Sequence, residues 1–87
     1  MRKISNSLYY GQKKFYVEVE NEDEDLDVYE GDLDVWVIYE PENDIKYIDE
    51  IYINHLFKEG EEIKFVKQDE IPQKVRDTIL KWAECEI

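Results

Sequence analysis

The sequence predicts an α+β fold: an antiparallel sheet of four to five strands with one C-terminal helix packed on one face. Apolar and polar residues alternate in several segments before residue 67, turn signals separate these segments, and helical spacing of apolar residues is clearest at the end of the chain. The 87 residues suffice for a single domain, residues 1–87. Because 14% of them are aromatic, we expect a packed core rather than acidic disorder.

The first predicted element is a hairpin over residues 7–20. Gly11 follows Leu8-Tyr9-Tyr10, and a glycine at this position suits a tight type II′ turn. The second arm alternates Phe15, Val17 and Val19 with polar residues, as a half-buried strand does. Residues 21–27 should form a loop or a short edge strand, and residues 29–32 are typical of a turn.

Residues 32–39 give the strongest strand pattern in the chain. Its second half is apolar on both faces, so we expect a central strand that is covered on one side. A turn is predicted at residues 41–44. Residues 45–58 leave two interpretations open, a strand or a helix that stops at Gly60. The enrichment in β-branched and aromatic residues favours a strand, at least through Ile53.

After a turn at residues 58–61, the pattern predicts a short strand at residues 63–66 and then the C-terminal helix. Pro72 suits the first turn of that helix. The residues that recur at helical spacing are Ile71, Val75, Ile79, Trp82 and Ala83. We expect Ile79 and Trp82 to anchor the helix against Val35 and Val37.

The charge of the chain is strongly negative and unevenly distributed. Asp and Glu number 23 against 11 Lys and Arg, a formal charge of −12. Such a charge opposes folding through self-repulsion and exceeds what solubility requires. From Glu18 to Asp34 there are ten carboxylates and no Lys or Arg, whereas the N-terminus is basic and the charges of the last helix balance. This charge disfavours direct binding to nucleic acid or to an anionic membrane surface.

The sequence carries little sign of enzymatic chemistry, and we expect neither an enzyme nor a cofactor. His55 is the only histidine, and Cys85 is the only cysteine and lies near a helix end. The three glycines are isolated, so no phosphate-binding loop is present. The lone thiol, the missing signal-peptide pattern and the lack of an apolar run of ~20 residues predict a cytoplasmic protein.

A metal site is predicted only in a weak form. Asp23, Asp25 and Asp27 fall at positions 1, 3 and 5 of a calcium-binding EF-hand loop. Position six is Val28 instead of glycine, and position twelve is Asp34 instead of glutamate. The three aspartates are therefore at most an exposed site for a divalent cation.

The acidic block is the candidate partner-binding surface. Alternate residues of a strand share a face and lie ~6.6 Å apart, so strand-borne carboxylates form a rigid row that resembles a phosphate backbone in charge and coarsely in spacing. Neighbouring aromatic side chains supply the anchors that protein interfaces need. The predicted surface consists of Glu18, Glu20, Glu22, Asp23, Glu24, Asp25, Asp27, Tyr29, Glu30, Asp32, Asp34, Trp36 and Tyr39.

The expected partner is a protein with a basic surface, of the kind that binds nucleic acid. In size, charge and composition the chain is similar to phage-encoded anti-CRISPR and anti-restriction proteins, and to small immunity proteins that neutralise nuclease toxins. That resemblance implies an inhibitor that acts as a nucleic-acid mimic. The alternative is a small cytoplasmic protein-interaction or structural domain whose acidity serves solubility, with or without a weak divalent-cation site.

Overall fold

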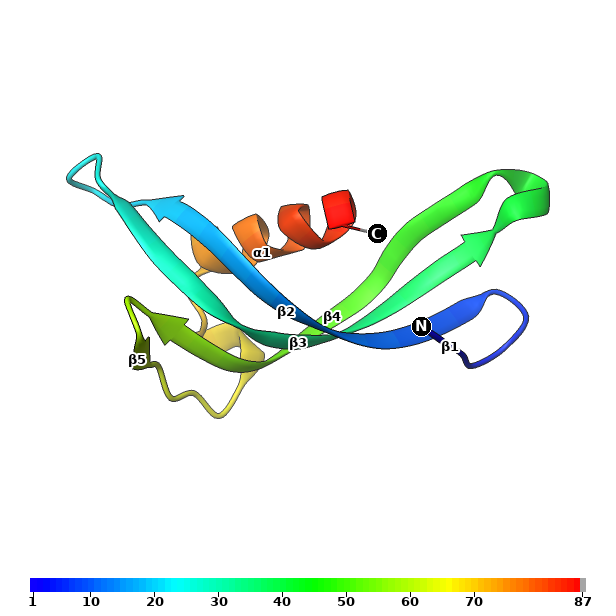
Figure 1. The fold of residues 1–87 in the computed structure, drawn as a ribbon, viewed down its shortest axis with the longest axis horizontal. Coiled ribbons are helices and arrows are strands. Elements are labelled where there is room, and N and C mark those ends of the chain that lie inside the picture. The colour runs from blue at the N-terminus through cyan, green and yellow to red at the C-terminus, as the bar shows by residue number, and fades with distance from the viewer. Residues whose placement is uncertain (87) are drawn as a thin grey trace.

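The computed structural model describes residues 1–86, which form a five-stranded antiparallel sheet in the order β1-β2-β3-β4-β5 and one α-helix (Figure 1). The elements are β1 (Arg2–Lys3), β2 (Leu8–Glu20), β3 (Leu26–Glu40), the 3-10 turn η1 (Pro41–Asn43), β4 (Ile45–Lys58), β5 (Glu61–Glu62), the 3-10 turn η2 (Gln68–Glu70) and α1 (Gln73–Glu86). This arrangement confirms the predicted α+β fold with a C-terminal helix on one face of an antiparallel sheet.

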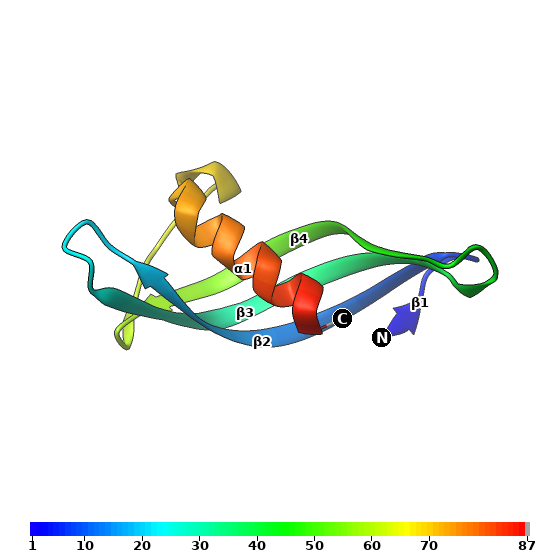
Figure 2. The same ribbon diagram turned by 90° about the horizontal axis from the view of Figure 1, so that it is seen from above.

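The three long strands β2, β3 and β4 form a twisted ribbon, and α1 lies obliquely across one of its faces (Figure 2). The molecule is elongated, with extents of 46 × 25 × 19 Å. The β2–β3 and β4–β5 connections lie at one end of the ribbon, and the β3–β4 hairpin lies at the other (Figure 1). No helix within residues 1–86 has the length and apolarity needed to cross a bilayer.

The core lies between α1 and the covered face of the sheet. Leu33, Ile53, Leu56 and Ile79 are completely buried there, each with 0% exposure. Ile79 shares this core with Val35 and Val37, so its predicted role as the helix anchor is confirmed. Trp82 is only half-buried and packs edge-on against Phe15 of β2, with ring centroids 6.3 Å apart, so it sits at the rim of the core.

The hairpin predicted at residues 7–20 is wrong, because β2 runs without interruption through Gly11. Gly11 pairs with Val35 of β3, and the register is continuous from Leu8 to Glu20. The N-terminal hairpin lies earlier and joins β1 to β2, with Arg2 opposite Tyr10. The glycine after Leu8-Tyr9-Tyr10 was the basis for predicting a turn. Thirteen successive pairings with β3 hold the segment extended instead.

The turn predicted at residues 29–32 is also wrong, since these residues are paired on both sides within β3. Gly31 lies opposite Phe15 of β2 and Leu56 of β4. A Cβ atom on Gly31 would lie 1.9 Å from the carbonyl oxygen of His55. The glycine is therefore needed for the close approach of β4, and no change of chain direction occurs there.

Residues 45–58 form a strand throughout, which resolves the two interpretations of this segment. Its register against β3 shifts twice, because Asp49 and Asn54 are extra residues that form bulges. Each bulge inserts one residue between two residues of the covered face. The covered-face residues Ile48, Ile51, Ile53 and Leu56 are therefore spaced by three, two and three positions, which resembles a helical pattern in the sequence.

The strand predicted at residues 63–66 is wrong, whereas the turn before it is confirmed. Glu59 and Gly60 both have positive φ angles and connect β4 to β5, which ends at Glu62. The position beside the middle of β4 is taken by the side chain of Gln68. Its amide accepts from the N–H and donates to the C=O of Ile53, both at 2.8 Å, as a neighbouring strand would.

Candidate functional site

The structure distributes the predicted surface over three places. The β2–β3 loop carries Glu22, Asp23, Glu24 and Asp25. The uncovered face of the sheet, here called the open face, carries Glu18, Glu20, Glu30, Asp32, Asp34 and Trp36, as the strand register requires. Asp27, Tyr29 and Tyr39 lie on the other face, the one that α1 covers in part.

The loop that joins β2 to β3 is held by the side chain of Asn21. Its Oδ1 accepts from the backbone N–H groups of Asp23 at 2.9 Å and Asp25 at 3.1 Å, and its Nδ2 donates to Asp27 at 3.2 Å. The Asn21 N–H donates to the Asp25 carbonyl and the Glu24 N–H donates to the Asn21 carbonyl, and these two backbone hydrogen bonds close the loop. The four loop carboxylates are therefore exposed but held on an ordered turn.

A second acidic segment, residues 59–62, lies beside the start of β3 and was not among the residues predicted from the sequence. The backbone N–H of Glu59 donates to the carbonyl of Val28, and a Glu59 carboxylate oxygen accepts from the Val28 N–H, both at 2.9 Å. The β4–β5 turn thus lies beside the start of β3. The sequence did predict a turn at residues 58–61. That this turn lies beside the start of β3 follows only from the pairing of β4 with β3.

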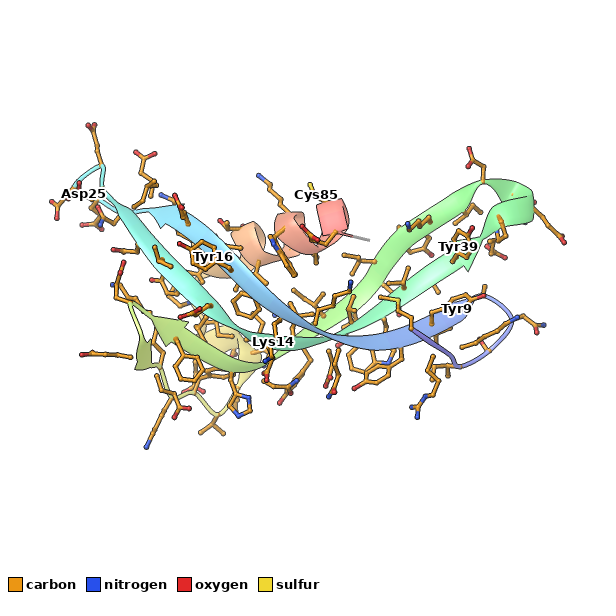
Figure 3. All side chains as sticks on the ribbon, in the orientation of Figure 1. Tyr9, Lys14, Tyr16, Asp25, Tyr39 and Cys85 are labelled. Atoms are coloured by element: carbon orange, nitrogen blue, oxygen red, sulfur yellow. The ribbon has the colours of Figure 1, made fainter. Side chains whose placement is uncertain are left out.

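Together these segments form one acidic end of the molecule (Figure 3, where Asp25 marks the loop). We define the acidic end by its ten exposed carboxylates: Glu18, Glu20, Glu22, Asp23, Glu24, Asp25, Glu30, Glu59, Glu61 and Glu62. None of the ten takes part in an ion pair within residues 1–86. Lys58 pairs with Asp27 at 3.5 Å, and the Lys74 amine donates to the backbone carbonyl of Glu20.

The open face continues the acidic row along β3. Glu30, Asp32 and Asp34 alternate on this strand, so the ~6.6 Å spacing expected for one face applies to them. Asp34 accepts a hydrogen bond from the Tyr10 hydroxyl at 2.6 Å. Asp32 is 2.9 Å from Nδ1 of His55, and both side chains remain substantially exposed.

The Tyr10–Asp34 pair perturbs both groups in the directions that favour the observed hydrogen bond. Burial raises the pKa of the Asp34 carboxyl, but hydrogen bonds from Tyr10, Gln12 and Asn54 outweigh that effect and lower the pKa below 3.8. The hydrogen bond to Asp34 raises the pKa of the Tyr10 hydroxyl above 10.0, with burial and the Asp34 charge acting in the same direction. Asp34 is therefore a fixed negative charge at neutral pH.

Aromatic side chains surround this row on the open face. Trp36 is half-buried and its ring centroid lies 5.2 Å from that of Tyr10, and the Arg2 guanidinium lies over the Tyr10 ring, 5.5 Å from the ring centroid. The side chains of Tyr16, Tyr47 and Tyr52 are 55%, 56% and 43% exposed. Such partly exposed aromatic surface beside fixed charge is common in protein interfaces.

Two predicted aromatic residues do not join this surface. Tyr29 is only 7% exposed and belongs to the core under α1. Tyr39 is exposed but lies towards the opposite end of the molecule, where its ring packs edge-on against Tyr9 with centroids 6.0 Å apart (Figure 3). Neither residue therefore belongs to the surface formed by the acidic end and the open face.

The aspartates of the weak metal candidate do not converge. Asp27 is engaged by Asn21 and Lys58, and Asp23 and Asp25 share the Asn21 side chain through their backbone N–H groups. Within residues 1–86, no three His, Cys, Asp or Glu side chains are grouped so that they could hold a metal ion. His55 and Cys85 lie on different elements, with His55 bonded to Asp32 on the open face and Cys85 exposed on α1.

No family model matches this chain, and no curated protein or solved structure matches it either.

Proposed function

We propose that this protein is an acidic inhibitor that occupies the basic, nucleic-acid-binding surface of a nuclease or another DNA- or RNA-handling protein. The observation that supports the proposal is the acidic end. Ten exposed carboxylates from two separate chain segments gather there without an ion-pair partner in residues 1–86. Surfaces that hold nucleic acid carry Lys and Arg for phosphates, and the same cations would bind these carboxylates.

The rigidity of the acidic end favours binding by charge. Asn21 fixes the β2–β3 loop, and Glu59 fixes the β4–β5 turn against Val28. A backbone that is already ordered loses little conformational freedom when a partner binds the carboxylates that it carries. Because opposite fields steer the encounter of the two proteins, association should be fast and should slow as salt is added.

The open face supplies the second part of the proposed surface. Asp32 and Asp34 continue the negative row beside the exposed ring of Tyr16 and the half-buried Trp36. Guanidinium groups stack on aromatic rings and form paired hydrogen bonds with carboxylates, so Arg-rich surfaces suit this combination. We expect the acidic end to attract the partner and the open face to set its orientation. The proposed location is the cytoplasm, where such partners act.

The test compares two variants that each lose four carboxylates. The loop variant carries Glu22→Gln, Asp23→Asn, Glu24→Gln and Asp25→Asn. The matched control carries Glu42→Gln, Asp44→Asn, Glu84→Gln and Glu86→Gln, which are also exposed but lie at the β3–β4 turn and on α1, outside the proposed surface. Both variants have the same net charge, so they differ only in where the charge is lost.

Proteins captured from a lysate at low salt and eluted by a salt step would be purified and assayed for binding to double-stranded DNA and to RNA. The native protein and the control variant should block that binding, and the loop variant should lose most of the inhibition. Equal inhibition by the two variants would contradict a localised acidic interface. Inhibition that is unchanged at high salt would contradict binding by charge.

The open face also supports the alternative function, a protein-interaction domain whose acids serve solubility. Tyr16, Tyr47 and Tyr52 are each more than 40% exposed on that face. Under this alternative, Tyr16→Ser with Tyr52→Ser would abolish partner capture, whereas the loop variant would retain it. Under the proposed function, the loop variant suffers the larger loss.

A further inference from the structure

The two long edges of the sheet are unequal. On the β4 side, β5 pairs with Phe57 and Lys58, the Gln68 side chain occupies the backbone groups of Ile53, and bulges at Asp49 and Asn54 interrupt the ladder. Bulges and covering groups are the usual means by which an edge is kept from pairing with another strand. The β4 edge is therefore closed to a further strand along much of its length.

On the β2 side, β1 pairs only with Tyr10 and Tyr9, and the rest of the strand is regular. The Ser7 carbonyl accepts from Tyr39 of β3, whereas the Leu8 carbonyl accepts from Ile4 on the other side. Backbone groups alternate in direction along a regular strand. The N–H and C=O groups of the even-numbered residues from Gln12 to Glu18 therefore point away from β3, outward from the free edge of β2.

The length of this unoccupied edge is set by two contacts. Met1 lies against Gly11 at its start, where an added Cβ would come within 2.9 Å of the Met1 Cγ. Lys74 donates to the Glu20 carbonyl at its end. Between these points no backbone hydrogen bond other than those of the β2–β3 ladder involves the strand, within the described part of the chain.

The charges along this edge of β2 are complementary to those of the same edge in a second copy of the chain. Lys14, Tyr16 and Glu18 are exposed and alternate on the open face. In an antiparallel pair of two β2 strands centred on Tyr16, each Lys14 lies directly opposite the Glu18 of the other copy, and the two Tyr16 residues face each other. On the covered face the same register places Phe15 opposite Val17. Opposite charges and apolar residues in directly opposed positions stabilise such pairs.

We propose that the β2 edge binds a second copy of this chain, with a two-fold axis at Tyr16 that joins the two sheets into one continuous sheet. A two-fold interface of this kind uses the same surface on both copies, which the self-complementary charges satisfy. This pairing offsets the mutual repulsion of two chains of charge −12 locally, at the edge. It leaves the β2–β3 loop outside the pairing and does not depend on the proposed inhibitory function.

Sedimentation equilibrium from micromolar to millimolar protein tests the pairing. The native protein should form dimers and no larger closed species. Lys14→Glu places like charges opposite each other twice in the dimer, and so does Glu18→Lys; each should raise the dimer dissociation constant about tenfold. The double exchange Lys14→Glu with Glu18→Lys should restore the native value. A native protein that stays monomeric, or a double exchange no better than the single variants, would overturn the proposal.

A cysteine at the two-fold axis tests the register. Residues that exchange both backbone hydrogen bonds have Cα atoms about 5.5 Å apart, within the range that a disulfide can bridge. In a Cys85→Ser background, Tyr16→Cys should form a covalent dimer under mild oxidation. The matched control is Tyr52→Cys, an exposed tyrosine of the same face on β4, which should stay monomeric. Equal cross-linking at the two positions would contradict pairing through β2.

Discussion

The covered and open faces of the sheet are built from alternate residues of the same three strands, and they differ in almost every property. On the covered face, Leu33, Val35 and Val37 of β3 are buried under α1. The residues of β3 that alternate with these three, Asp32, Asp34 and Trp36, lie on the open face and are partly exposed. The difference teaches that this small protein uses one face for stability and leaves the other available for carboxylates and aromatic rings. Substitutions on the two faces should therefore affect different measurements.

The largest expected effect comes from the covered face. Ile79→Ala removes the fully buried anchor of α1 and leaves a cavity, so the free energy of unfolding should fall by about 2–5 kcal/mol. Urea denaturation followed by Trp fluorescence measures the change. Tyr52→Ala on the open face is the comparison and should cause a clearly smaller loss. Similar losses for both variants would contradict the view that the covered face provides most of the stability.

Gly31→Ala should rank next, because it places a methyl group against a backbone atom. The new Cβ would lie 1.9 Å from the His55 carbonyl oxygen, so β3 and β4 must separate. Overpacking of this kind costs about 1–3 kcal/mol of unfolding free energy. Gly11→Ala is the control, since its Cβ meets only the flexible Met1 side chain, and its thermal midpoint should stay near that of the native protein. A greater loss for Gly11→Ala would contradict the pairing shown here.

On the open face, Tyr10→Phe should change the pH dependence of stability more than its value at neutral pH. Asp34 has a lowered pKa, so its stabilising contribution is complete above its unfolded pKa and is lost as the pH falls through the folded value, below 3.8. Tyr10 has a raised pKa, so its contribution is complete below pH 10.0 and is lost as the pH rises through the folded value. Thermal midpoints across both limits should show that Tyr10→Phe weakens both dependences. Unchanged profiles would contradict the importance of this hydrogen bond.

The smallest effect on stability should come from the loop variant with four neutralised carboxylates. The loop is ordered by Asn21 and by backbone N–H groups, which Asn and Gln substitutions preserve. Removing charge from a chain of −12 also lowers self-repulsion, so its urea midpoint should be equal to or above the native one. The same variant should lose the proposed binding. A marked loss of stability would show that these carboxylates serve folding.

Several features were determined by the sequence alone. The alternation around Leu33, Val35 and Val37 was enough to predict a central strand, because a period of two can bury only one set of residues. Pro72 and the helical spacing up to Ala83 predicted α1, which begins one residue after the proline. The concentration of charge at residues 18–34 was equally visible, since it needs no knowledge of the fold.

The tertiary structure decided the features that depend on distant partners. Gly11 and Gly31 are typical of turns when taken locally, yet pairing with neighbouring strands keeps both segments extended. The bulges of β4 made its covered-face residues look helical, because a bulge adds a residue without adding a partner. The same pairing brings Glu59 beside Val28 at the start of β3, and packing within the core buries Tyr29. Sequence therefore determined how much charge this protein carries, and the packing of β3 against β4 decided which carboxylates share one surface.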